Sequence, residues 1–206
     1  MSGSTRPRIA PLCESLAKTG QVFVEQLDSL SIQTIRDLQM MTLGAQLRGS
    51  RNTTLGKSAT VEVFNLIEGL VRPYVESQTT QKLELKNDSG RKVLVLFSSD
   101  PDIAITEDLP SGVRPLVSIE IKGGTDISNI HNRIGEAEKS HQKAKGQGFF
   151  EIWTILGADA DLKMASRESP TTTRFYRLSR LRDDTSPDHN DFRDRLHSVI
   201  GIKGIS

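Results

Sequence analysis

Three residues in the middle of the chain combine acid and amine groups at a spacing suited to metal-assisted chemistry. Asp102 stands at the start of an expected strand, and Glu120 and Lys122 lie two residues apart in a second expected strand over residues 116–122. Side chains at positions i and i+2 of a strand point to the same face of a sheet. We therefore expect Glu120 and Lys122 to emerge side by side, close to Asp102 on a neighbouring strand.

Two carboxylates from different strands suit Mg²⁺, which prefers oxygen ligands and keeps positions for water and phosphate. The backbone carbonyl of Ile121 can add a neutral oxygen ligand. A bound metal ion lowers the pKa of its water and screens a phosphate, as phosphodiester hydrolysis requires. Lys122 can orient or deprotonate that water, or stabilise charge on the pentacovalent phosphorus, and the sequence leaves these roles open. The competing interpretation is an exposed Glu120–Lys122 ion pair of little energetic value.

The order Pro101-Asp102 followed by Glu120-Ile121-Lys122 resembles the PD-(D/E)xK nuclease motif. That superfamily includes most type II restriction endonucleases, some repair nucleases and junction resolvases. The resemblance covers the chain from about residue 58 to residue 156. It implies that Asp102 and Glu120 bind the metal ion and that Lys122 is the catalytic lysine.

Many members of this superfamily add an acid from the first core helix. Glu62 is the first candidate for that role here and Glu68 the second, although a solvated helical glutamate explains either residue equally well. A rival metal nuclease site built on His131 and His141 has little support, because no cysteine or second histidine stands at ligand spacing.

The elements that must position these residues follow from the hydrophobic pattern. Alternation predicts strands, and a stripe of apolar residues three or four apart predicts a helix. The expected elements are short helices over 8–48 with a break at Gly20, a helix over 58–76, strands over 82–86, 91–97, 102–106, 116–122 and 149–156, a helix over 128–145, a possible strand over 173–181 and a helix over 191–200. This order predicts an α/β or α+β fold with a central mixed sheet flanked by helices, and the resemblance implies a restriction endonuclease-like core.

The segment after Lys122 is the candidate DNA-contacting region. Gly123 and Gly124 either allow a phosphate or base to approach the backbone closely or simply form a strand-to-helix turn. Side chains able to contact DNA bases or phosphates follow on the next helix and precede the first core helix: Asn129, Asn132, Arg133, Lys143, Arg51 and Lys57. A solvated surface is the alternative explanation for each group.

Composition permits a nuclease without indicating one. The chain has 206 residues, 35% of them hydrophobic, and a formal net charge of +1, so it lacks the basic excess common in nucleic-acid proteins. No apolar run approaches the length of a membrane span, and the N-terminus has no secretory pattern. Cys13 is the single cysteine, which excludes an internal disulfide. We expect a cytoplasmic protein.

Together these features predict a Mg²⁺-dependent type II restriction enzyme that cuts double-stranded DNA as a homodimer, the simplest way to cut both strands of a symmetric site. We expect residues 1–57 to form a helical region for dimerisation or DNA contacts and residues 58–206 to form the nuclease core with a C-terminal extension, within one structural domain. The alternatives are a repair or structure-specific nuclease with the same active site, or a non-catalytic DNA-binding protein.

Overall fold

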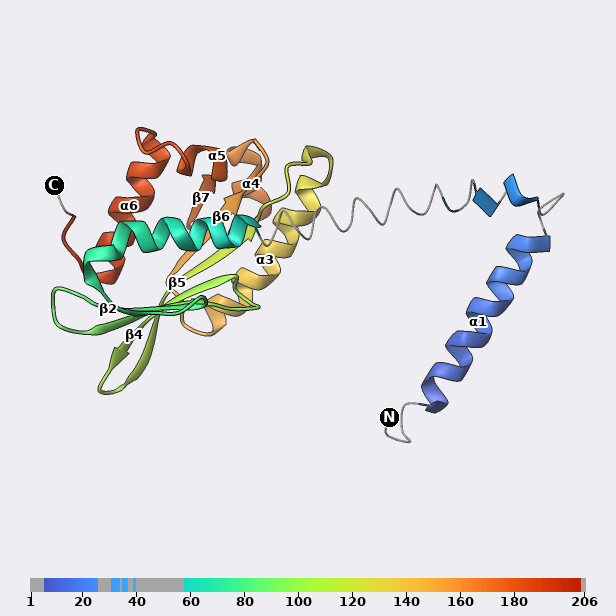
Figure 1. Cartoon of the computed structure of the whole chain (residues 1–206), viewed down its shortest axis with the longest axis horizontal. Coiled ribbons are helices and arrows are strands. Elements are labelled where there is room, and N and C mark those ends of the chain that lie inside the picture. The colour runs from blue at the N-terminus through green and yellow to red at the C-terminus, as the bar shows by residue number, and fades with distance from the viewer. Residues whose placement is uncertain (1–5, 26–30, 34, 37–38, 40–57, 205–206) are drawn as a thin grey trace. The chain divides into compact units, whose positions relative to one another are not determined.

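The chain divides into two compact units, residues 1–50 and residues 51–206. The computed structural model describes residues 6–25, 31–33, 35–36, residue 39 and residues 58–204 (Figure 1). Because residue 57 lies outside these ranges, the expected division between residues 57 and 58 stays a prediction. None of the helices in this described part is long and apolar enough to cross a membrane.

The described part of the first unit contains one long helix, α1 (Arg6–Glu25). Gly20 lies within α1, so the expected break at this glycine is wrong. A glycine inside a helix costs only about 1 kcal/mol relative to alanine, which the other residues of a long helix can offset. Most of the remaining residues expected to be helical up to residue 48 lie outside the described ones.

The second unit is built around one seven-stranded sheet whose spatial order follows the chain. Its strands are β1 (Val75–Gln78), β2 (Lys82–Lys86), β3 (Lys92–Phe97), β4 (Ile103–Leu109), β5 (Gly112–Lys122), β6 (Glu151–Leu156) and β7 (Arg174–Arg177). Strands β1 to β5 pair antiparallel, whereas β5, β6 and β7 run parallel. The expected central mixed sheet and the α/β class are confirmed.

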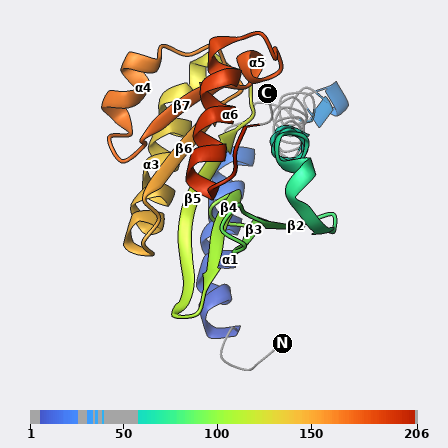
Figure 2. The same ribbon diagram turned by 90° about the vertical axis from the view of Figure 1, so that its left-hand side faces the viewer.

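Helices cover both faces of this sheet (Figures 1 and 2). They are the helix over residues 58–71, the 3-10 turns η1 (Arg72–Tyr74) and η2 (Ile127–Asn129), α3 (Ile130–Gly146), α4 (Leu162–Glu168), α5 (Leu178–Leu181) and α6 (Pro187–Ile200). The 58–71 helix and α6 bury Ile67 and Phe192 in one core with Ile119 and Trp153 of the sheet. Helix α3 packs on β5 and β6, on the opposite face.

Two of the expected elements end earlier than predicted. The helix expected to reach residue 76 ends at residue 71, because Pro73 enters a 3-10 turn and Val75 begins the edge strand β1; a proline cannot continue the helical hydrogen bonding. The strand expected over residues 173–181 ends at Arg177, and α5 follows. There Leu178 and Leu181, three residues apart, are both buried, which is a helical spacing.

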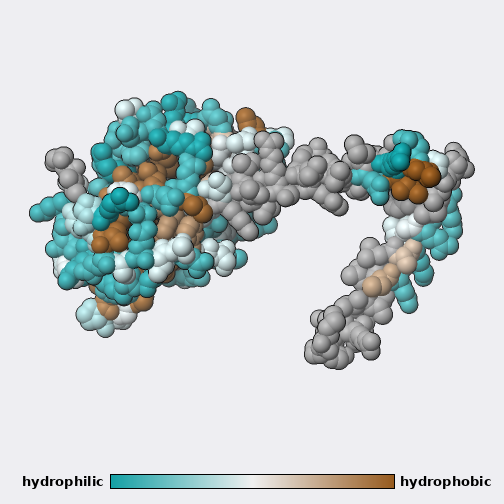
Figure 3. All heavy atoms as spheres, viewed as in Figure 1, coloured by the Kyte–Doolittle hydropathy of each residue, from teal (hydrophilic) through white to brown (hydrophobic). Residues whose placement is uncertain are grey.

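The surface of the second unit is mostly hydrophilic in the view of Figure 3, with small apolar patches between polar side chains. Large hydrophobic residues exposed on this unit include Val61, Val113, Ile127 and Phe150. They lie on separate elements, as is common for single exposed apolar residues.

Candidate active site

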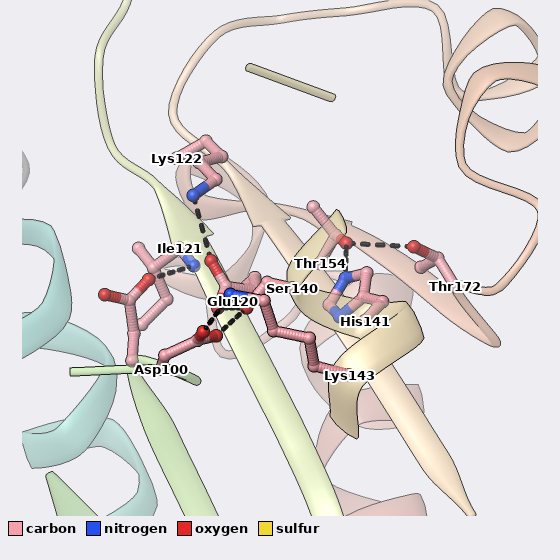
Figure 4. Close-up of polar contacts among 10 residues, drawn as sticks. Asp100, Glu120, Ile121, Lys122, Ser140, His141, Lys143, Thr154 and Thr172 are labelled. Atoms are coloured by element: carbon pink, nitrogen blue, oxygen red, sulfur yellow. Dashed lines mark hydrogen bonds and ion pairs between the residues drawn. The ribbon is translucent and has the colours of Figure 1, made fainter. Parts of the chain in front are cut away.

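The C-terminal end of β5 carries Glu120 and Lys122, the acid and the amine predicted to act together. Glu120 and Lys122 both face α3, and Lys122 Nζ lies 2.9 Å from Glu120 Oε2 (Figure 4). Ile119 and Ile121 point the other way, into the core under the 58–71 helix. The Glu120 residue is 4% exposed, and a buried carboxylate is costly unless it is paired. The alternation therefore buries Glu120 and sets beside it the Lys122 side chain, which is 19% exposed, so the pair is not the fully exposed ion pair of the competing interpretation.

Asp102 is tied to the same strand by a backbone contact. It immediately precedes β4, which pairs with β5 so that Ile103 lies opposite Ile119. Its Oδ2 accepts a hydrogen bond of 2.7 Å from the amide of Ile121, the residue between Glu120 and Lys122. Burial and then the charge of Glu120 raise the pKa of Asp102. The structure thus brings the three predicted residues together at one point.

Two further side chains of α3 and one acid complete this cluster, and the sequence interpretation did not assign them to it. Ser140 Oγ donates to Glu120 Oε1 at 2.6 Å and also contacts Asp100 Oδ1. Lys143 Nζ lies 2.9 Å from Asp100 Oδ2. The hydrogen bond from Ser140 and then that from Lys143 lower the pKa of Asp100. The available signal was the Asp-Pro-Asp segment and the three-residue spacing of Ser140 and Lys143 on one helix face.

The carboxylates suit a hard divalent cation. Asp102 and Glu120 offer only oxygen donors, and burial, followed by the charge of Glu120, raises the pKa of Asp102. Among the described residues, no group of three or more His, Cys, Asp or Glu side chains is arranged to hold a metal ion. A cation held by two carboxylates would keep most positions for water and phosphate, which is the coordination that Mg²⁺ accepts.

The backbone just beyond Lys122 is crowded. The amide of Gly157 donates to the carbonyl of Lys122 at 2.9 Å. A Cβ at Gly157 would lie 2.6 Å from the carbonyl carbon of Gly123 and 3.0 Å from its Cα, and a Cβ at Gly124 would overlap the guanidinium of Arg133. Gly157 therefore needs glycine for the close backbone approach, whereas at Gly124 the end of the Arg133 side chain could move aside.

The candidate DNA-contacting residues of the α3 region have distinct surroundings. Asn132 Nδ2 donates to Asn129 Oδ1 at 2.8 Å on the exposed start of the helix. Arg133 lies half-buried against Gly124, and its Nη1 is buried without a hydrogen-bond partner among the described residues. Lys143 contacts Asp100, as stated above. The remaining two candidates, Arg51 and Lys57, lie outside the described residues.

Glu62, the first candidate for a fourth acid, is engaged elsewhere in this structure. Both of its carboxylate oxygens accept hydrogen bonds from Arg182, at 2.5 and 2.9 Å. Glu68 pairs with Arg72 at 3.1 Å. Glu62 nonetheless lines a cleft that also includes Gly123, the residue after Lys122, so it lies near the end of β5 while its charge is offset by Arg182.

Comparison with known proteins finds similarity to restriction enzymes. A family model described as XcyI restriction endonuclease matches residues 1–203. The chain is 40% identical to the type II restriction enzyme Cfr9I of Citrobacter freundii, over 96% of this chain and 61% of that protein. It is also 40% identical to the type II restriction enzyme XcyI of Xanthomonas campestris pv. cyanopsidis, over 93% of this chain and 59% of that protein. The chain thus spans about three fifths of the length of these relatives. No solved structure matches it.

Proposed function

The chain belongs to the XcyI restriction endonuclease family, and from this premise we propose that it is a Mg²⁺-dependent, sequence-specific endonuclease that hydrolyses phosphodiester bonds of double-stranded DNA. The observation that carries the proposal is the convergence of Asp102, Glu120 and Lys122 at the end of β5: a buried carboxylate, a half-buried carboxylate and an ammonium. The two relatives described above are named as type II restriction enzymes.

In this proposal each residue has a defined role. Asp102 and Glu120 bind the cation through carboxylate oxygens, and the carbonyl of Ile121 is the proposed neutral third ligand. Bound Mg²⁺ supplies an activated water and screens the phosphate. Lys122 holds its ammonium beside Glu120, so a positive charge is in place before the negative charge on the phosphate grows in the transition state. The ion pair supports this electrostatic role for Lys122.

The proposed substrate surface lies along η2 and α3. Asn129 and Asn132 are exposed there and carry amides suited to base edges, while Arg133 brings an unpaired buried N–H next to the glycine turn after Lys122. Arg51 and Lys57 remain proposed phosphate contacts. A homodimer acting in the cytoplasm completes the proposal, since two copies of one site cut a symmetric duplex most simply.

Glu62 remains the proposed fourth acid, with a condition set by the structure. It can reach a metal ion only after Arg182 releases it, because Arg182 occupies both carboxylate oxygens. The side chains of Arg182 and Glu62 are 60% and 35% exposed, and solvent weakens ion pairs that it reaches, so the exchange is energetically accessible. Slower cleavage by Glu62→Gln at limiting Mg²⁺ would support recruitment, and wild-type cleavage would remove Glu62 from the site.

The decisive experiment is cleavage of mixed plasmid and phage DNA with and without Mg²⁺. We expect discrete Mg²⁺-dependent fragments that disappear with Lys122→Ala. Lys163→Ala is the matched control, since this lysine is exposed on α4, and it should cut like the wild type. Equal cleavage by Lys122→Ala would refute the mechanism, and cleavage confined to flaps or junctions would replace sequence-specific cutting by a structure-specific activity.

A further inference from the structure

A series of hydrogen bonds, most of them buried, begins and ends on α3 beside the candidate site. His141 Nε2 lies 2.7 Å from Thr154 Oγ1 on β6, and Thr154 Oγ1 lies 3.1 Å from Thr172 Oγ1. Thr172 Oγ1 lies 2.8 Å from Ser169 Oγ, which donates to Glu138 Oε2 at 2.7 Å. Glu138 and His141 are one helical turn apart. We call this series the His141–Glu138 chain.

The hydrogens of the His141–Glu138 chain can run in only one direction. Each hydroxyl has a single hydrogen to donate. Ser169 gives its hydrogen to the carboxylate of Glu138, so Ser169 accepts from Thr172, and by the same count Thr172 accepts from Thr154. Thr154 must then accept from a protonated Nε2 of His141.

This count assigns the state of the buried histidine. His141 is fully buried, and burial lowers its pKa to about 4, so the ring is neutral at pH 7. Its one hydrogen is on Nε2, which leaves Nδ1 as a bare ring nitrogen. Nδ1 is indeed buried without a hydrogen-bond partner among the described residues. A buried N–H at that position would carry the larger penalty of an unmade donor.

The far end of the chain is a well-satisfied carboxylate. Glu138 Oε1 accepts from Thr171 Oγ1 at 2.6 Å, and Oε2 accepts from the Thr171 amide at 3.1 Å. Burial raises the pKa of Glu138, but the hydrogen bonds from Thr171 and Ser169 outweigh it and leave a net lowering. An ionised acceptor therefore sets the direction of every bond back to His141.

The His141–Glu138 chain fastens α3 at the place where α3 meets Glu120. Thr154 is the register partner of Glu120 across β5 and β6. Ser140, which precedes His141, donates to Glu120 Oε1 (Figure 4). The His141–Thr154 and Ser140–Glu120 contacts thus join one turn of α3 to two paired residues of the sheet. The first contact is buried between structural residues, and the second is made to the proposed active-site acid.

We propose that His141 is a positioning residue for Glu120. His141 holds α3 against β6 through Thr154, at the helical turn where Ser140 orients the Glu120 carboxylate for a divalent cation. The inference rests on the proposed role of Glu120 as a metal ligand. Groups that orient a metal ligand through hydrogen bonds change metal affinity or activity by about 10-fold to 100-fold when they are lost. A carboxylate that rotates freely must instead be ordered when the cation binds, which weakens binding.

The test is Thr154→Val in the full chain. Valine keeps the size and the strand preference of threonine but removes the acceptor for His141. Thr154→Ser restores the hydroxyl, and Ser118→Ala is the matched control, because Ser118 Oγ is buried on the same strand as Glu120 with no partner among the described residues. The measurements are calorimetric Mn²⁺ titration, the Mn²⁺ dependence of DNA cleavage and thermal unfolding.

We expect Thr154→Val to raise the half-saturating Mn²⁺ concentration by up to about 10-fold, the lower end of the range for a direct partner of a metal ligand. Thr154→Ser and Ser118→Ala should stay close to the wild type. Imidazole ¹⁵N shifts should identify His141 as the Nε2–H form. A Thr154→Val chain that melts earlier but binds Mn²⁺ like the wild type would overturn the inference, as would an Nδ1–H histidine. A wild-type chain that binds Mn²⁺ without cutting DNA refutes the proposed function alone, and one that binds no Mn²⁺ refutes both.

Discussion

Replacing Gly157 by alanine tests whether the crowded backbone behind Lys122 holds the catalytic strand in place. The new Cβ would lie 2.6 Å from the carbonyl carbon of Gly123 and 3.0 Å from its Cα. Carbon atoms pack comfortably at about 3.5 Å or more, so the two backbones must separate by about 1 Å. That rearrangement costs about 1–3 kcal/mol. Loss of the hydrogen bond from Gly157 to Lys122 adds about 1 kcal/mol.

We therefore expect Gly157→Ala to lower the free energy of unfolding by about 2–4 kcal/mol and to slow single-turnover cleavage about 100-fold, as an error of 1 Å in a catalytic group does. Urea unfolding and plasmid cleavage at saturating Mg²⁺ measure the two effects. The control is Gly135→Ala in α3, where a Cβ meets nothing within 4 Å and helix preference should stabilise the chain by up to about 1 kcal/mol. Wild-type stability and cleavage in Gly157→Ala would refute the reasoning.

Three other outcomes follow from the charges. Burial and the charge of Glu120 raise the pKa of Asp102, so at pH 7 the ionised side chain destabilises the folded state relative to the unfolded one. Asp102→Asn should therefore raise the melting temperature of the metal-free chain while abolishing cleavage. A lower melting temperature would contradict this. Burial lowers the pKa of His141 from 6.5 to about 4, so the folded chain binds fewer protons than the unfolded chain in that window. Between pH 6.5 and pH 4, the unfolding free energy of the wild type, measured in urea, should fall by at most about 3 kcal/mol more than that of His141→Gln. If the unfolding free energies of the two chains change equally with pH, His141 is not responsible. Arg133→Ala should weaken duplex binding in Ca²⁺ and make it less sensitive to salt if the guanidinium contacts a phosphate, whereas an unchanged affinity removes Arg133 from the DNA surface.

The arrangement of the sheet was largely predictable from local patterns. Strict alternation around Glu120 correctly separated the charged face of β5 from the face of Ile119 and Ile121. At Leu178 and Leu181 the strand prediction was wrong, because two apolar residues in so short a segment do not distinguish a helix from a strand. The edge strand β1 was missed because most of its side chains are exposed and carry no apolar pattern.

The sequence by itself determined the chemistry that the chain can offer: an acid and a lysine two residues apart on a strand, and a second acid before another. It could do so because the two-residue period of a strand assigns side chains to a face without reference to the rest of the fold. Only the tertiary structure decided which residues surround them. The contacts of Ser140 with Glu120 and of Arg182 with Glu62 join residues 20 and 120 positions apart, and they depend on how helices dock on the sheet. The placement of Glu120 beside Lys122 therefore follows from local geometry, whereas the approach of Asp102 and the orientation of Glu120 by α3 are consequences of packing.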